Sequence, residues 1–412
     1  MIRLRKAKFL IIWFLTRNPT QRLLLQAFLY GPILFSLYLM FRVHQIMEQV
    51  DLKLITGSEG TVEHKYWKPN DSYNLTNYIQ EFEETALIMP SGLCKQKSLL
   101  TVFVTSRLDG FKTRKVIRET WGNSTRFNYP EFIKMHGHLK GLYKPFLQSR
   151  LLLYAEHLRR ENYSLYASVQ IVFIVGRSNS PSSDSTLSKL QQEAGQYNDI
   201  LQEDFVDTYN NLTLKSVFAL KHVNNKCFNN SAYFLKTDDD CFVNVPNIIH
   251  FLLGGTIPAY QSHRKGQTRL TATKGVLMGY AFFGNKPIRY SCSKFYLPNY
   301  IYTDTMYPSY LSGSGYLMSM DVVQRLYKAA WSTRLIHFED LFITGFCSIA
   351  AQVKPVHSPL FDLKTIHKAC FIKGGVVQHD VGIAGMKDVF HRLTNNKTNC
   401  AVKRSTRILT VY

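Results

Sequence analysis

Leu99-Leu100-Thr101-Val102-Phe103-Val104 is a nearly unbroken apolar run, which is typical of a β-strand buried on both faces. Two further apolar runs follow, Val169–Val175 (VQIVFIV) and the shorter Ala232–Leu235 (AYFL). Between these two, the stretches Leu187–Tyr197 and Leu212–Val223 are rich in helix formers, with apolar residues at helical spacing in the second. Buried strands that alternate with helices predict an α/β body with a mostly parallel central sheet.

The third apolar run leads directly into Lys236-Thr237-Asp238-Asp239-Asp240. Ligands of parallel sheets bind at the carboxyl ends of the strands. Three neighbouring carboxylates repel one another, and a hard cation such as Mg²⁺ or Mn²⁺ relieves that cost while it bridges to substrate phosphates. The acidic residues alone equally allow a solvated loop or a helix N-cap. The strand before the run and the apolar Cys241-Phe242-Val243 after it favour a metal–diphosphate site.

The N-terminal segment predicts a membrane anchor. Leu23–Phe41 is a stretch of 19 residues without a charge, about the length of a membrane-spanning helix. Only basic charges precede it, so the positive-inside rule leaves the N-terminus in the cytosol. A cleaved signal peptide is the alternative, but the charged leader is long and no clear cleavage site follows. We therefore expect a cytosolic tail (1–22), an anchor (23–41), a stem (42–93) and a lumenal body (94–412).

The composition agrees with a folded lumenal protein. Hydrophobic residues make up 45% of the chain and charged residues 19%, with a net charge of +21 at pH 7. No zinc-finger, basic-zipper or RNA-binding signature accompanies this charge, so we expect no nucleic-acid partner. All seven cysteines follow the anchor, where disulfides can form, and their odd number leaves at least one free or paired between chains. Glycosylation triplets begin at Asn70, Asn74, Asn123, Asn162, Asn211, Asn229 and Asn396.

Five sequence blocks, in order, resemble one known family. The blocks are Arg114–Gly122 (RKVIRETWG), Asp199–Lys215, Lys236–Asn244 (KTDDDCFVN), Tyr307–Tyr316 (YPSYLSGSGY), and Phe338–Leu341 with Gly345 and Cys347. Together they resemble the β-1,3-galactosyltransferase family, which includes N-acetylglucosaminyl- and N-acetylgalactosaminyltransferases, over about residues 94–392. The resemblance implies a GT-A-type nucleotide-binding fold. It also implies inverting transfer of a sugar from a UDP-sugar donor to a glycan acceptor on protein or lipid.

The resemblance also assigns the donor site. Asp240 and His379 take the positions of the ligands of the metal ion, Mn²⁺ or Mg²⁺. Asp238 and Asp239 take positions that contact the nucleotide or the ion. Without the resemblance, His379 would be interpreted as a surface or packed histidine.

Asp340 occupies the position of the catalytic base in the family. A carboxylate within reach of the acceptor hydroxyl can take its proton as attack proceeds. The neighbouring Glu339 is an alternative base, and either residue is also a suitable carboxylate for the first turn of a helix. Gly313 and Gly315 allow either a close approach to the sugar or an ordinary turn.

Two charged pairs have both a functional and a structural interpretation. Arg114 and Arg118 are spaced to share one helix face, where they would bind the phosphates of the nucleotide or pair with acids such as Glu119. Asp207 and Lys215 either orient the site or form a structural ion pair.

Four residues depart from the family pattern. Cys241 replaces a small or β-branched residue, and we expect a buried thiol there. Leu311 replaces a cysteine that many members have, Leu341 replaces a valine, and Ser314 replaces a loop glycine. The serine raises the alternative of a catalytically inactive relative that binds glycans or acts as a chaperone. A metal-dependent phosphohydrolase is a third interpretation, but the additional carboxylates and histidines of a two-metal site are not found in the sequence.

The resemblance finally implies a location and partners. It predicts a single-pass type II protein of the Golgi membrane with a lumenal catalytic domain. It also allows for a homodimer or a complex with other Golgi transferases.

Overall fold

The structure is a computed structural model that describes residues 30–43, 72–123, 128–139, 141–178, 184–260, 267–291, 293–363, 369–395, 400–401 and 408–411. The chain divides into two compact units, residues 1–64 with 287–303 and residues 65–286 with 304–412. The predicted cytosolic tail and residues 23–29 of the predicted anchor lie outside the described residues, and residues 30–43 form a helix. Within the described ranges, no helix combines the length and the apolar character needed to cross a membrane.

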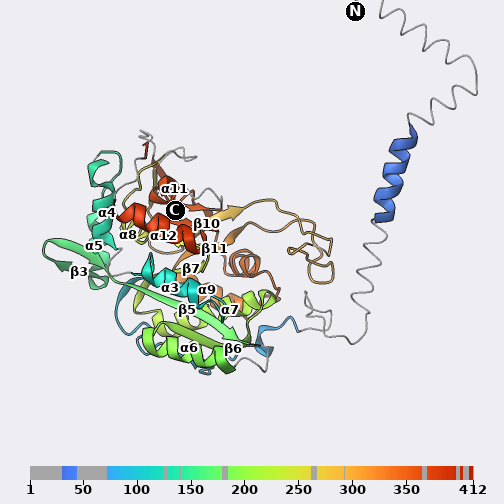
Figure 1. Ribbon diagram of the computed structural model, residues 1–412, viewed down its shortest axis with the longest axis horizontal. Helices are drawn as coiled ribbons and strands as arrows, with labels where there is room; N and C mark the ends of the chain where they lie inside the picture. The colour runs from blue at the N-terminus through green and yellow to red at the C-terminus, as the bar shows by residue number, and fades with distance from the viewer. Residues whose placement is uncertain are drawn as a thin grey trace, which may run out of the picture. The chain divides into compact units, whose positions relative to one another are not determined.

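The larger unit is built on an eight-stranded sheet with the order β1-β6-β5-β2-β7-β11-β10-β12 (Figure 1). The strands are β1 (Ala86–Ile88), β2 (Ser98–Thr105), β5 (Val169–Arg177), β6 (Ile200–Val206), β7 (Ser231–Asp238), β10 (Leu277–Phe282), β11 (Tyr310–Ser319) and β12 (Val356–His357). The four central strands β6, β5, β2 and β7 are parallel, and β1 and β11 flank them in antiparallel orientation. The three predicted strands are confirmed as β2, β5 and β7, and the sheet is parallel at its centre and mixed toward its edges.

Helices lie between the strands as the sequence predicts. The α-helices of the larger unit are α3 (Phe111–Glu119), α4 (Tyr129–His136), α5 (Gln148–Leu153), α6 (Asp184–Tyr197), α7 (Leu212–His222), α8 (Val245–Leu252), α9 (Met320–Ala330), α10 (Cys347–Ala350), α11 (Ala369–Lys373) and α12 (Gly382–Thr394). The two predicted helical stretches are confirmed in α6 and α7. All but the first residue of α7 are buried, because this helix packs against both the central strands and α9.

The order of the strands creates a switch point between β2 and β7. From β2 the chain steps outward to β5 and then to β6, whereas β7 lies on the other side of β2. Right-handed crossovers therefore place α3 and α6 on one face of the sheet and α7 on the other. The crevice at the carboxyl ends of strands that diverge in this way is where α/β sheets bind ligands. The carboxyl ends of β2 and β7 carry Thr105 and Asp238.

A second, three-stranded sheet lies beside this switch point. Its order is β13 (Phe361–Asp362), β14 (Val377–Gln378) and β8 (Phe242–Val243). The antiparallel pairing of β14 with β8 brings the residue after Gln378 next to the residues before Phe242. The smaller strands form two separate pairs. β3 (Leu158–Glu161) and β4 (Ser164–Ala167) form an antiparallel hairpin, and β9 (Gln267–Leu270) pairs in parallel with the distant β15 (Ile408–Val411).

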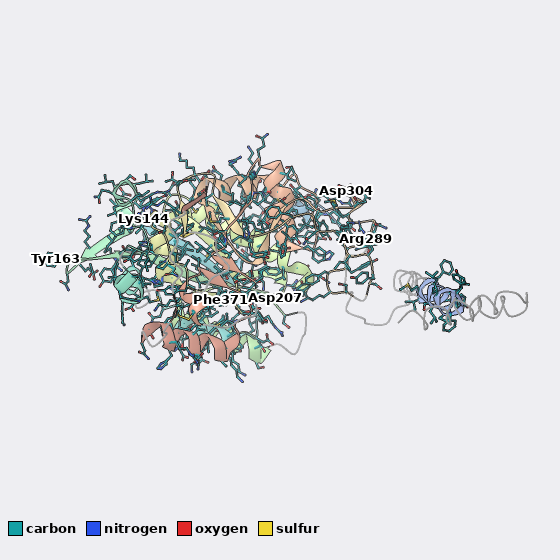
Figure 2. All side chains as sticks on the ribbon, turned by 90° about the horizontal axis from the view of Figure 1, so that it is seen from above. Lys144, Tyr163, Asp207, Arg289, Asp304 and Phe371 are labelled. Carbon is teal, nitrogen blue, oxygen red and sulfur yellow. A yellow bond between two sulfur atoms is a disulfide. The ribbon has the colours of Figure 1, made fainter. Side chains whose placement is uncertain are left out.

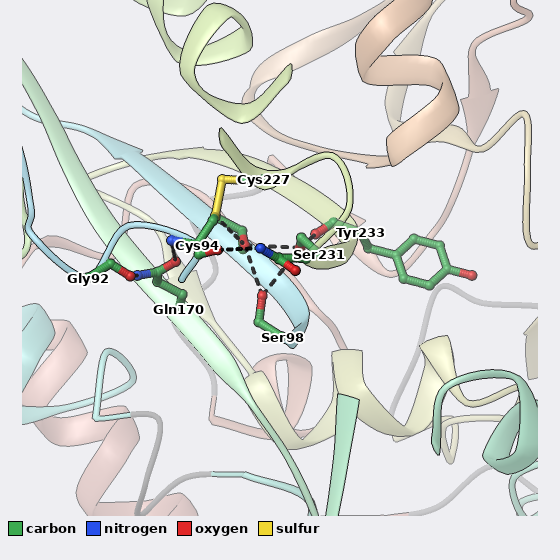
Figure 3. The surroundings of a disulfide bond; sticks show 9 residues. Gly92, Cys94, Ser98, Gln170, Cys227, Ser231 and Tyr233 are labelled. Carbon is green, nitrogen blue, oxygen red and sulfur yellow. Dashed lines mark hydrogen bonds between the residues drawn. A yellow bond between two sulfur atoms is a disulfide. The ribbon is translucent and has the colours of Figure 1, made fainter. Parts of the chain in front are cut away.

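Two disulfides, Cys94–Cys227 and Cys370–Cys400, link distant segments. The first joins the residues that precede β2 to those that precede β7, at the end of these strands opposite to the switch point (Figure 3). Cys241 is a buried free thiol, as predicted.

The turn between β3 and β4 is exposed. Asn162 and Tyr163 lie there with φ values of 47° and 64°, in the left-handed region that asparagine tolerates better than most residues. Tyr163 projects from the tip of this hairpin (Figure 2). The glycosylation triplet that begins at Asn162 therefore lies on the surface of the body.

Candidate active site

The acidic run follows β7 at the switch point. Thr105 Oγ1 donates a hydrogen bond to Asp238 Oδ1 at 2.6 Å, and Ser106 Oγ donates to Asp239 Oδ2 at 2.7 Å. The carboxyl ends of β2 and β7 are therefore joined by two hydroxyl–carboxylate bonds. Burial raises the pKa of Asp239, and the charges of Asp238 and Asp240 add to this effect. Thr105 and Ser106 have no place in the sequence prediction, although both immediately follow the predicted first strand.

Asp240 and His379 come together from distant parts of the chain. His379 Nε2 lies 3.5 Å from Asp240 Oδ2, with side-chain exposures of 34% and 47%. Two backbone bonds hold this pair, from the N–H of His379 to the oxygen of Asp362 and from the N–H of Val381 to the oxygen of Asp240. The hydrogen bond to Asp240 raises the pKa of His379. Burial raises the pKa of Asp240, but the interactions with His379 outweigh it and the pKa is lowered.

Asp240 and His379 fit a divalent metal ion that is bound by both the protein and the substrate. Among the described residues, no three His, Cys, Asp or Glu side chains form a metal-binding group. A carboxylate oxygen and an imidazole nitrogen are suitable ligands for Mn²⁺, and an exposed pair leaves the remaining positions to water and diphosphate oxygens. Asp240 and His379 thus suit an open substrate-bridging site better than a closed structural one.

Asp340 lies at the start of the π-helical turn Leu341–Phe346. Its Oδ1 accepts the N–H of Leu341 at 2.8 Å, and its Oδ2 accepts the N–H of Gly313 at 3.3 Å. Burial and the charge of Glu339 raise the pKa of Asp340 to about 7. The side chain is only half-buried, so it can reach a substrate. A carboxyl group that titrates near neutral pH is suited to proton transfer.

Glu339, the alternative base, is engaged within the protein. Its Oε1 accepts the hydroxyl of Tyr316, and its Oε2 lies 3.4 Å from Lys236 Nζ. Both Glu339 and Tyr316 are buried. The structure therefore favours Asp340 as the carboxylate that is available for chemistry.

Lys236 connects the two carboxylate regions. The residue is only 3% exposed, and its ammonium donates to Asp238 Oδ1 and to the carbonyl of Gly313, both at 2.6 Å. Burial lowers the pKa of Lys236, but Asp238 and Glu339 outweigh it and the pKa is raised. One buried cation thus connects β7, β11 and the turn that carries Asp340. The sequence prediction gave Lys236 no role.

The glycines of the Tyr307–Tyr316 block allow close packing against protein groups. A Cβ at Gly313 would lie 3.0 Å from Glu339 Oε2, and one at Gly315 would lie 3.0 Å from Val377 Cγ1. Ser314, which replaces a family glycine, is buried, and its hydroxyl lies 3.0 Å from that of Ser312. Asp340 accepts the N–H of Gly313, the residue before this serine.

The structure places Arg114 and Arg118 in an ion-pair network. Arg114 Nη2 lies 2.7 Å from Glu193, and Arg118 lies 2.7 Å from both Glu193 and Asp199. Arg114 is fully buried, and its Nη1 also donates to Ser106 Oγ at 3.2 Å. The structure therefore favours the ion-pair alternative for both arginines, with acids other than Glu119. A phosphate contact through Arg114 would require these bonds to break.

Asp207 and Lys215 form a buried ion pair with a separation of 2.6 Å. Lys215 Nζ also donates to the carbonyl of Ser106 at 2.7 Å. This pair therefore supports the loop that carries Ser106.

Two tyrosines flank Asp340. Burial and the nearby charge of Asp340 raise the pKa of both Tyr209 and Tyr310. Tyr209 is 54% exposed, and Tyr310 is half-buried. Tyr209 lies in the family-like block Asp199–Lys215 and Tyr310 in the block Tyr307–Tyr316. No sequence signal distinguished either residue from an aromatic residue of the core.

The site can be compared with known proteins. A sequence model of the galactosyltransferase family matches residues 156–359. β-1,3-Galactosyltransferase 1 of Mus musculus is 28% identical over 310 residues, 75% of this chain and 78% of that protein. Lactosylceramide 1,3-N-acetyl-β-D-glucosaminyltransferase A of Danio rerio is 28% identical over 291 residues, with coverages of 70% and 64%. β-1,3-Galactosyltransferase 2 of Mus musculus is 27% identical over 339 residues, with coverages of 81% and 65%. The family match includes Asp238–Asp240 and Asp340 and ends before His379.

Proposed function

The chain belongs to the β-1,3-glycosyltransferase family, and from that premise we propose that it transfers a hexose or N-acetylhexosamine from a UDP-sugar to a glycan acceptor. The transfer inverts the anomeric carbon and forms a β-1,3 linkage. The observation that carries the proposal is the position of Asp340. Lys236 bonds to Asp238, to Gly313 and to Glu339, and so connects a half-buried carboxyl group with a pKa of about 7 to the acidic run at the switch point.

The reaction requires only one proton transfer to the protein. The ionised Asp340 accepts the proton of the acceptor hydroxyl while that oxygen bonds to the anomeric carbon of the donor. The bond from the anomeric carbon to the diphosphate breaks on the opposite side, and its electron pair leaves with UDP. The N–H groups of Leu341 and Gly313 hold the carboxylate in place, so no covalent intermediate with the enzyme is needed.

The donor end of the site is formed by the acidic run. Asp240 and His379 would hold the Mn²⁺ or Mg²⁺ ion, which when bound neutralises charge on the diphosphate. Asp238 and Asp239 are held by Thr105 and Ser106, and in our proposal they orient the nucleotide at the switch point.

We expect transfer to depend on a divalent cation. Full-length protein in detergent, assayed with Mn²⁺ and UDP-galactose, UDP-N-acetylglucosamine or UDP-N-acetylgalactosamine, should release UDP with one of these donors. A chelator or the Asp240→Ala substitution should reduce the rate at least about a hundredfold, because a ligand of the ion is lost. Asp204→Ala is the matched control, since Asp204 is exposed and forms a surface ion pair with Arg177. Equal rates with and without chelator would contradict the metal site, and no turnover with any donor would contradict the proposed function.

We further propose that the protein is anchored in the Golgi membrane as a single-pass type II protein with a lumenal body. The uncharged stretch Leu23–Phe41, the two disulfides and the exposed Asn162 support this placement. In sealed Golgi vesicles, added protease should spare the body, and Asn162→Gln should remove one glycan that peptide N-glycosidase releases. Digestion of the body in intact vesicles would contradict this topology.

A further inference from the structure

A row of aromatic rings crosses the outer strands of the main sheet, beginning beside Asp340. Tyr310 and Phe282 are register partners on β11 and β10, with ring centroids 5.1 Å apart. The Phe282 ring lies 5.5 Å from that of Tyr280, and the Tyr280 ring lies 5.3 Å from that of His357. We call these four residues the aromatic row. Burial and the nearby charge of Asp340 raise the pKa of Tyr310, the first member of the row.

The far end of the row opens into a cavity of about 220 Å³. Tyr280 and His357 line this cavity, together with further aromatic and polar side chains. These include Tyr260, Phe361, Phe371, Asp362 and Gln378. The row therefore connects the proposed catalytic base to a cavity with both aromatic faces and polar groups.

The rings of the row are less buried than the aliphatic residues beside them on the same strands. Tyr310, Phe282 and Tyr280 are half-buried and His357 is exposed, whereas the neighbouring Leu277 and Leu311 are fully buried. Aromatic rings that keep part of their surface open beside a cavity are typical of a binding surface.

His357 is fixed in a defined orientation. The N–H of Ala281 donates to His357 Nδ1 at 3.2 Å, which leaves the proton of the neutral ring on Nε2. Partial burial of the ring lowers the pKa of His357. The row thus ends in a hydrogen-bond donor beside the cavity.

We propose that the aromatic row is an acceptor-binding track for an oligosaccharide of at least two sugar rings. A pyranose has an apolar C–H face that packs on aromatic rings and a rim of hydroxyls that needs polar partners, and the row and its cavity offer both. The terminal sugar presents its hydroxyl to Asp340, and the sugars behind it lie along Phe282 and Tyr280 toward His357. This inference rests on the proposed function and deepens it by naming the acceptor class.

The test compares acceptors of two lengths. The full chain is assayed with p-nitrophenyl β-galactoside and with a tetrasaccharide of two Galβ1-4GlcNAc units, and with the matching pair that ends in N-acetylglucosamine. In the wild type, kcat/KM should be higher for the tetrasaccharide. Tyr280→Ala should lower the ratio of tetrasaccharide to monosaccharide kcat/KM about tenfold, with KM for the UDP-sugar changed less than twofold. Tyr280→Phe should keep most of the ratio, because the ring is retained.

Phe283→Ala is the matched control. Phe283 is an adjacent aromatic residue, 62% exposed, and is not a member of the row. Its loss should leave the ratio unchanged. A wild-type ratio of tetrasaccharide to monosaccharide kcat/KM near one would overturn the track. The track would also be overturned if neither Tyr280→Ala nor a further variant, Phe282→Leu, lowered this ratio. An increase in the KM for UDP-sugar in these variants would assign the row to the donor instead. A wild type that transfers to none of these acceptors, but releases UDP, would contradict the track alone, whereas no turnover at all would contradict the proposed function.

Discussion

Replacing Asp340 with asparagine is expected to lower kcat by a factor of about 10²–10⁴, the contribution of a positioned general base. Asparagine keeps the shape of the side chain and can still accept the N–H of Leu341, but it cannot take a proton from the acceptor. The KM for the UDP-sugar should stay within about twofold, because the donor is proposed to bind at Asp238–Asp240. Asp388→Asn provides a control for the charge change, since Asp388 lies on the exposed face of α12 beside Arg392.

The pH dependence of kcat/KM should identify Asp340 as the general base. Asp340 must be ionised to accept a proton, so kcat/KM in the wild type should fall about tenfold per pH unit below the pKa of about 7. The groups around it are Glu339, which raises this pKa, Lys236, which lowers it, and the neutral Tyr209 and Tyr310. The residual activity of Asp340→Asn should lack this acidic limb. If the residual activity of Asp340→Asn kept the wild-type pH dependence, the acidic limb would belong to another group.

The thermal stability of Asp340→Asn provides a check on the folding of this variant. Folding raises the pKa of Asp340 from 3.8 to about 7, so the protein binds this proton more tightly when folded. The contribution of the group to stability is therefore greatest at low pH and declines between these two values as the pH rises. At pH 8, Asp340→Asn should melt no lower than the wild type. A large drop in Tm would indicate that the loss of activity reflects misfolding.

Lys236→Met should destabilise the protein by about 3–5 kcal/mol, the usual cost of removing one partner from a buried ion pair. The buried Glu339 would retain the hydroxyl of Tyr316 but lose its cation, and the carbonyl of Gly313 would lose its donor. Denaturant unfolding of the full chain in detergent measures this loss.

A double variant separates charge from packing. Lys236→Met leaves both Asp238 and Glu339 without their cation, but the side chain of Asp238 is 34% exposed and that of Glu339 only 7%. The additional Glu339→Gln substitution removes the buried charge and should recover more than half of the lost stability. Activity should stay low, since the bond from β11 to Lys236 that supports Asp340 is still absent. A loss of less than about 1 kcal/mol in the single variant, or no recovery in the double variant, would contradict the bridging role of Lys236.

The sequence by itself determined three of the four central parallel strands and the position of the acidic run at the end of one of them. Apolar runs such as Leu99–Val104 are local signals, and a strand buried on both faces has few alternatives. Because parallel strands carry ligands at their carboxyl ends, the place of Asp238–Asp240 followed from the strand before it. The buried thiol of Cys241 could be anticipated for the same local reason.

The tertiary structure alone decided which charged groups meet. Arg114 and Arg118 share a helix face as predicted, but their partners Glu193 and Asp199 come from α6 and from the residue just before β6. The pairing of β14 with β8 brings His379 to Asp240. The choice between Glu339 and Asp340 depends on Lys236, which lies 103 residues earlier in the chain. Side-chain partners of this kind are set by strand register and crossover direction, and local propensity carries no information about either.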